Sequence, residues 1–269
     1  MDLKQRRLDA ALAKELLVVE KQEKKMEQTA LKAKPATWKK ELESRIPEKV
    51  YTGLESAFGK GFGVFFDQGR VVIEKSYNKE NLRTDHAIRD FAVKLKGGRK
   101  ELKQMHKSAK QSDFVNMAVT TVEGIGLGAL GVGMPDIVLF LGNLLKGVYE
   151  TALNYGFDYE SRQEQLLILK MMQTALSSGE SWVQRNTEVE EMLELETVGI
   201  TDEMFNQQVK DTASAFAMDM LLLKFIQGLP VVGIIGGAAN PVYYSKVMKY
   251  VQLKYRKRYL LKQKEIPQR

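Results

Sequence analysis

The chain has 269 residues, of which 44% are hydrophobic and 28% are charged. This composition is ordinary for a folded protein and too apolar for a disordered chain. There is no cysteine, which excludes disulfides, zinc–thiolate sites, iron–sulfur clusters and a thiol nucleophile, and which is compatible with a reducing cytosol.

The formal net charge of +7 is distributed unevenly along the chain. Residues 1–113 carry 26 basic and 17 acidic groups, residues 185–211 carry 2 and 8, and residues 212–269 carry 10 and 2. Basic ends around an acidic centre predict a polyanion nearby, either nucleic acid or an anionic membrane surface. The first residues hold no apolar run of the secretory type, so no signal peptide is predicted.

The N-terminal segment is predicted to be an amphipathic helix. Residues 3–33 are rich in Leu, Ala, Glu, Lys and Gln and contain no Gly or Pro. One apolar stripe follows this helix: Leu8, Leu12, Leu16 and Val19. Pro35 is expected to end it. We therefore treat residues 1–34 as a helical extension and residues 35–269 as the main domain.

The next segments also favour helices. Pro47 suits the first turn of a helix, and the glycines of Gly59–Gly63 are expected to break or bend it. Residues 79–95 are typical of a helix with a polar face, and the glycine pair 97–98 of a turn. "GRVVIEKSY", residues 69–77, fits a short strand, but strand alternation is otherwise scarce and an all-α chain is favoured.

Helix-start signals recur in the second half. Ser161 and Glu164 fit a capping box ahead of an apolar-periodic run. Residues 186–211 are typical of an acidic helix, a turn and then another helix begun by Thr201 or Asp202. The remainder is strongly apolar and closes with a basic tail.

The stretch "GIGLGALGVGMPD", Gly124 to Asp136, contains a G-x-G-x-x-G pattern. A dinucleotide fingerprint needs an uninterrupted helix after its glycines, and Pro135 would break that helix. We therefore interpret these glycines as packing residues and expect no cofactor.

Small residues four apart let helix backbones approach closely. Such pairs are formed by Gly124 with Gly128 and by Gly233 with Gly237. The predicted architecture is thus an all-α multi-helix bundle in which two glycine-rich apolar segments, near 114–148 and 213–247, pack together. It also has an amphipathic N-terminal helix and a basic C-terminal helix.

The second apolar segment contains an uncharged run, Phe225 to Ser245, that is long enough to cross a bilayer. It also holds two prolines and two amide side chains, which are awkward for a simple span. A buried core helix, a monotopic or re-entrant membrane element and an integral span near 225–245 all stay open.

Two motifs resemble the EcsC family. "GLGALGVGMPDIVLFLGNLLKGVYETALNYGFDYESRQEQLLIL" resembles its central signature, and "GLPVVGIIGGAANPVYYSKVMKYVQLKYRKRYL" resembles its second one. The resemblance covers residues 36–262 and leaves the N-terminal helix outside. It implies a mostly helical fold, a bacterial setting and association with the cytoplasmic membrane or with ABC transporter components, and it supplies no catalytic residues. The matching positions include Gly133, Pro135, Asp136, Tyr155, Gly156, Gly233, Gly237 and Asn240.

Two carboxylates beside apolar segments are candidate functional groups. Glu123 and Asp136 could bind a cation or a basic partner. Alternatively, Glu123 pairs with a lysine, and Asp136 lies at the positive end of a helix dipole behind Pro135. His86 and His106 are expected at the surface, because no metal-ligand or catalytic spacing surrounds them.

The basic tail interleaves lysines and arginines with tyrosines. Aromatic rings favour the headgroup region of a bilayer, and basic residues favour an anionic leaflet. The predicted membrane or anion contacts are Lys246, Lys249, Tyr250, Lys254, Tyr255, Arg256, Lys257 and Arg258. A solvated amphipathic helix and a nucleic-acid contact are the alternatives for this tail.

The sequence therefore favours a non-enzymatic protein that is cytoplasmic and peripherally associated with the inner face of a bacterial membrane. Its expected partners are anionic lipid or a membrane-transport protein. A soluble enzyme with a carboxylate-lined pocket is the second hypothesis, and a nucleic-acid-binding module is the third.

Overall fold

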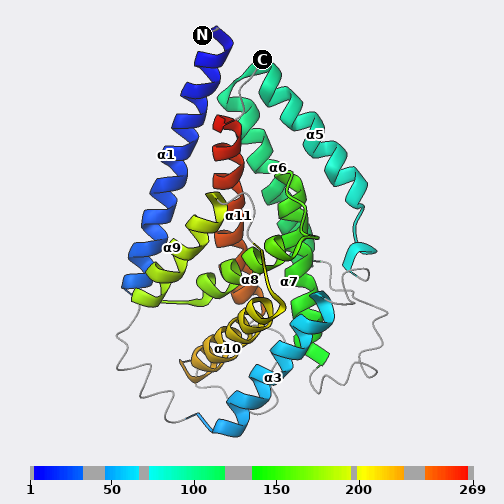
Figure 1. Ribbon diagram of the computed structural model, residues 1–269, viewed down its shortest axis with the longest axis vertical. Helices are drawn as coiled ribbons and strands as arrows, with labels where there is room; N and C mark the ends of the chain where they lie inside the picture. The colour runs from blue at the N-terminus through cyan, green and yellow to red at the C-terminus, as the bar shows by residue number, and fades with distance from the viewer. Residues whose placement is uncertain are drawn as a thin grey trace.

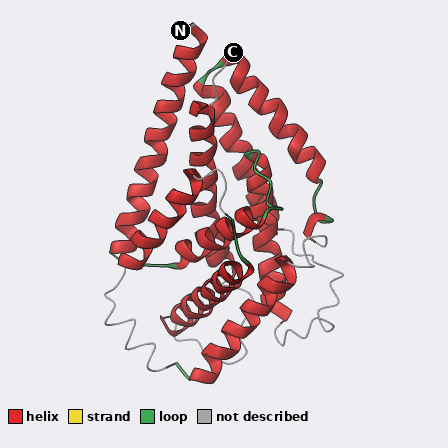
Figure 2. Cartoon of the chain, viewed as in Figure 1, coloured by secondary structure: helices red, strands yellow, loops and turns green. Residues whose placement is uncertain are grey.

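Helices form the regular secondary structure throughout the residues that the computed structural model describes: 3–32, 46–66, 73–118, 135–194, 199–226 and 240–265. In these ranges the predicted all-α multi-helix fold is confirmed (Figures 1 and 2). The helices are α1 (Leu3–Leu31), α3 (Glu48–Val64), α5 (Lys79–Lys96), α6 (Arg99–Ala118), α7 (Pro135–Asn154), α8 (Arg162–Leu176), α9 (Glu180–Glu194), α10 (Asp202–Ile226) and α11 (Asn240–Glu265).

The basic C-terminal helix α11 runs through the middle of the molecule (Figure 1). It packs against α1, α7 and α8, with further contacts to α6 and α9. Val251, Tyr255 and Tyr259 are at most 2% exposed, so its inner turns belong to the hydrophobic core. The helix begins at Asn240, as the Asn–Pro dipeptide predicts.

A second part of the core is aromatic and joins α3, α7 and α10. The ring of Phe216 lies 5.2 Å from that of Phe58 and 5.6 Å from that of Phe62, between ring centroids. The predicted break in this region is wrong, because α3 continues unbroken from Glu48 to Val64. Gly61 serves close packing instead, since a Cβ there would lie 2.7 Å from Cδ1 of Leu141 on α7.

Several predicted helix ends are confirmed. Gly97, predicted as part of a turn, ends α5 at φ +59°; at the other end of this helix Asn78, which was not predicted as a cap, accepts a hydrogen bond from the backbone N of Asn81. Ser161 caps α8 in the same way, accepting from Glu164 N at 3.1 Å. Thr201 accepts from the backbone N of Met204 at the start of α10.

Helix α1, predicted as an extension of the domain, packs along α11, α6 and α9. Its stripe residues Leu8, Leu12 and Val19 are at most 1% exposed. The spacing predicted the apolar stripe, and the structure shows that the stripe packs against other helices of the same chain.

The glycine pairs and Glu123 lie outside the described residues, so the predicted packing of the glycine-rich segments stays a prediction. The described parts of the two apolar segments do touch. Gly147 on α7 faces Tyr244 on α11 so closely that a Cβ would overlap the tyrosine hydroxyl. None of the helices in the described ranges is long and apolar enough to cross a bilayer.

The surface placement predicted for the two histidines is wrong. His86 and His106 are both half-buried at helix interfaces. His86 donates from Nδ1 to the carbonyl oxygen of Asn154 at 3.0 Å, and His106 Nδ1 lies 2.9 Å from the hydroxyl of Tyr155. The signature glycine Gly156, at φ +79°, makes room for the His86 ring.

We expect Gly156→Ala to lower the free energy of unfolding by about 2 kcal/mol, because its backbone is left-handed and its Cβ would overlap the imidazole. Chemical denaturation measures this change. Gly53→Ala in α3 is the matched control: nothing lies within 4 Å of its Cβ, so it should stabilise the protein. Equal effects at the two positions would contradict this role of Gly156.

Burial lowers the pKa of His106 to about 4, and repulsion from Arg256 and Lys110 adds to the effect. The unfolded chain therefore binds more protons between pH 6.5 and 4, and the free energy of unfolding should fall as the pH falls through this window. In His106→Gln this proton uptake is absent. The stability difference between the two proteins should therefore depend on pH between 6.5 and 4 and be constant above pH 7. A difference independent of pH throughout would contradict this assignment.

Candidate functional site

The cations of α11 face carboxylates on the helices around it. Lys254 is fully buried; its Nζ lies 2.6 Å from Glu23 on α1, and it also pairs with Glu190 on α9. Lys257, one turn away, lies 2.8 Å from Glu23 and 2.5 Å from Glu190. Two lysines and two glutamates thus join three helices.

Glu15 on α1 is a buried carboxylate that forms ion pairs with two arginines. Its carboxylate is 1% exposed and accepts hydrogen bonds from Arg256 on α11 and Arg99 on α6. Burial alone would raise the pKa of Glu15, but the hydrogen bonds and charges of the two arginines lower it overall. The carboxylate is therefore ionised in the folded protein near neutral pH.

The other face of α11 meets α8 and α5. Glu164 accepts from Tyr255 at 2.7 Å and from Arg258 at 2.7 and 2.9 Å. Asp90 on α5 accepts from Tyr259 at 2.9 Å and from Gln263 at 2.7 Å. These tyrosines are hydrogen-bond donors of the interior.

The structure separates the eight residues predicted as membrane or anion contacts. Tyr250, Lys254, Tyr255 and Arg256 are buried, and Lys257 and Arg258 are half-buried and ion-paired. Lys246 and Lys249 are exposed, and Lys246 lies 3.0 Å from Asp219. The eight side chains thus do not form one exposed surface, because carboxylates of the same chain satisfy most of the cations.

Of the two candidate carboxylates, only Asp136 lies in the described part of the chain. Asp136 is exposed in the first turn of α7, directly after Pro135, as the helix-dipole interpretation predicts. Glu123 lies outside the described residues. Among the described side chains, no group of His, Asp and Glu could hold a metal ion.

Exposed cations of three elements meet at one end of the molecule, which we name the basic end. It comprises the first turns of α1, the α5–α6 turn and the last turn of α11 (Figure 1). A Cβ at Gly97 would lie 3.2 Å from the carbonyl oxygen of Lys4, which places the α5–α6 turn against α1. The exposed cations there are Lys4, Arg6, Arg7, Lys96, Arg99, Lys100, Lys103, Lys262 and Lys264.

An exposed apolar stripe on α5 adjoins the basic end. Ile88, Phe91 and Leu95 are 63, 65 and 55% exposed, and their spacing places them on one helix face. At the tip, Leu3 of α1 is 83% exposed. Helix α5 lies at the outer edge of the molecule (Figure 1), with Val93 on its inner face fully buried.

The sequence did not predict that Glu15 and Glu23 form ion pairs inside the molecule, or that the α5 stripe is exposed. Glu15 interrupts an apolar face of α1, which signals a buried charge, but its partners lie more than eighty residues away. The exposure of the stripe was not predicted, because an apolar helix face is ordinarily expected to pack against the core.

In the described ranges these features define a helical protein whose interior contains ion pairs. Its basic end adjoins an exposed apolar stripe. The model of the EcsC protein family matches residues 10–260, and the chain belongs to this family. The match begins inside α1, so most of this helix lies within the matched residues.

Protein EcsC of Bacillus subtilis (strain 168) is 26% identical over 202 residues, which cover 74% of each chain. No solved structure matches the chain.

We expect Glu15→Gln to lower the free energy of unfolding by about 3 kcal/mol, because it leaves the guanidinium of Arg256 buried without its counter-charge. Glu20→Gln, an exposed position on the same helix, makes the same chemical change and should alter stability by less than about 0.5 kcal/mol. Chemical denaturation at pH 7 compares the two variants. Similar small effects would show that α1 is not held by this pair.

Proposed function

We propose that the chain acts at the inner face of a bacterial cytoplasmic membrane, where its basic end docks on anionic lipid as a peripheral protein. The single observation that carries this proposal is that exposed cations and exposed apolar side chains adjoin at one end. Family membership supports the same setting, because the resemblance implies a membrane or transport association.

The chemistry of this end fits a lipid–water interface. Lysines and arginines near an anionic leaflet each contribute about 1 kcal/mol. Burial of one large apolar side chain contributes about 2 kcal/mol. The cations at the basic end and the three α5 side chains therefore contribute comparable amounts of binding free energy, and firm binding needs both.

The apolar stripe favours a membrane over nucleic acid. Nucleic-acid surfaces recruit cations and stacking aromatic rings, whereas Ile88 and Leu95 are aliphatic and gain little from a phosphate backbone. Tyr250, Tyr255 and Tyr259 of α11 are also withdrawn from base stacking, since they are buried and donate their hydroxyls to protein acceptors.

The test is vesicle co-sedimentation of the full chain with and without anionic lipid. Deletion of residues 246–269 is unsuitable, since it removes most of the core helix α11. Substitution of Lys4, Lys96, Lys100 and Lys103 by glutamine should weaken binding to anionic vesicles at least about tenfold and reduce its salt dependence.

The matched control replaces four other exposed lysines, Lys21, Lys24 and Lys25 on α1 and Lys32 directly after it, and so has the same net charge as the first variant. It should bind almost as the unaltered chain does. Equal loss in the two sets would show attraction by net charge alone and would overturn the proposed site.

A second experiment tests the apolar part. Substitution of Ile88, Phe91 and Leu95 by serine should weaken vesicle binding about tenfold or more without loss of folding, because these side chains are exposed. The control changes exposed Leu17, Met204 and Val242 in the same way. Unchanged binding by the α5 variant would contradict insertion of this stripe.

A further inference from the structure

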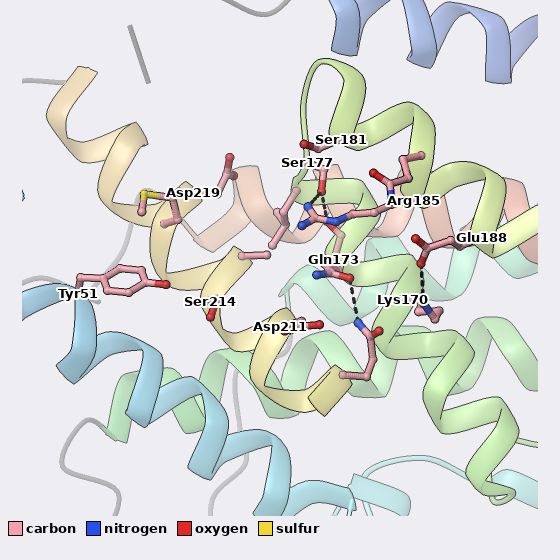
Figure 3. Close-up of a pocket in the computed structure, with 15 residues that line it drawn as sticks. Tyr51, Lys170, Gln173, Ser177, Ser181, Arg185, Glu188, Asp211, Ser214 and Asp219 are labelled. Atoms are coloured by element: carbon pink, nitrogen blue, oxygen red, sulfur yellow. Dashed lines mark hydrogen bonds and ion pairs between the residues drawn. The ribbon is translucent and has the colours of Figure 1, made fainter. Parts of the chain in front are cut away.

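A polar pocket opens between α8, α9 and α10, with Tyr51 of α3 at its rim (Figure 3). Its volume is about 510 Å³. Ligand sites commonly fall in the range of about 300–1,000 Å³. In Figure 1, α3 and α10 lie toward the end of the molecule opposite the basic end, so this pocket belongs to a different surface.

The wall formed by α8 and α9 presents donors. Arg185 reaches in from α9 and donates to the hydroxyl of Ser177 (Figure 3). In the described part of the chain, no carboxylate lies within ion-pair distance of this guanidinium. The other cation of this wall, Lys170, is neutralised by Glu188 at 2.6 Å. Arg185 therefore carries the uncompensated positive charge of the pocket.

The opposite wall, α10, presents carboxylates. Asp219 is neutralised by Lys246 at 3.0 Å. Asp211 accepts a hydrogen bond from Gln207 at 2.7 Å, and no cation among the described residues pairs with it. The pocket thus holds one uncompensated carboxylate facing the wall that holds one uncompensated guanidinium (Figure 3).

The side chains between these charges are fixed by their own hydrogen bonds. Ser177 donates to the carbonyl oxygen of Gln173 at 2.8 Å while it accepts from Arg185. Gln173 in turn accepts from Gln208 at 2.9 Å. The guanidinium is therefore held in place before any ligand arrives, which lowers the entropic cost of binding.

We propose that this pocket binds a small zwitterion with a carboxylate and a primary ammonium, of the class of short peptides and amino acids. The carboxylate meets the planar fork of Arg185, and the ammonium meets Asp211. A molecule with only one charge leaves the other protein charge uncompensated, so the pocket discriminates in favour of zwitterions.

Isothermal titration calorimetry of the full chain with three probes tests the proposal. The probes are trialanine, N-acetyl-trialanine, which lacks the ammonium, and trialanine amide, which lacks the carboxylate. Trialanine should bind at least about tenfold more tightly than either capped form. Equal affinity of all three would overturn the proposal, and preference for the N-acetyl form would show a simple anion site.

Two variants assign the charges. Asp211→Asn should weaken trialanine binding about tenfold and leave N-acetyl-trialanine unaffected. Arg185→Gln should weaken trialanine binding equally and leave the amide unaffected. This crossed pattern is not produced by partial unfolding, which would weaken all probes together.

The matched controls are Asp202→Asn and Lys210→Gln, which make the same charge changes on exposed parts of α10 outside the pocket. Both should bind trialanine as the unaltered chain does. If either control weakens binding as much as its pocket counterpart, the two charged walls are not the site. A thermal melt of each variant verifies that it is folded.

Discussion

The arrangement of this protein depends on the burial of a strongly cationic helix among carboxylates from its neighbours. Helix α11 carries Lys254 and Arg256 into the interior, where Glu23, Glu190 and Glu15 compensate them. A buried charge without its partner costs several kcal/mol. Because the carboxylates come from α1 and α9, the compensation also fixes where those two helices lie. Tyr255 and Tyr259 of the same helix donate to the carboxylates of Glu164 and Asp90.

Because carboxylates of the same chain neutralise the buried cations of α11, the distribution of charge along the sequence needs a different interpretation. The acidic centre of the chain supplies α8 and α9, and their glutamates face the basic C-terminal helix. The polyanion that the sequence predicts beside the basic tail is thus partly the protein itself. The exposed cations that an outside partner can reach include those of the basic end, which adjoins the apolar stripe of α5. The buried cations of α11 are thus neutralised by carboxylates of the same chain, whereas the cations of the basic end are exposed.

The family signature, where the structure describes it, serves the fold. Pro135 and Asp136 begin α7, and Tyr155 with Gly156 ends it in a tight turn against His86. The proposed membrane contact and the proposed zwitterion pocket use other residues, on α5 and on α9 with α10.

The sequence by itself determined the helices and many of their ends. Gly97, Ser161 and Thr201 act within one turn of the chain, so local spacing is enough to predict them. Only the tertiary structure decided which faces are covered, because hydrophobic spacing gives a helix its stripe and not its neighbour. The spacing of Ile88, Phe91 and Leu95 is that of a core face, yet they are exposed, and α11 is basic yet central. Contacts between residues such as Glu15 and Arg256, which are 241 positions apart, follow from the folding of the whole chain.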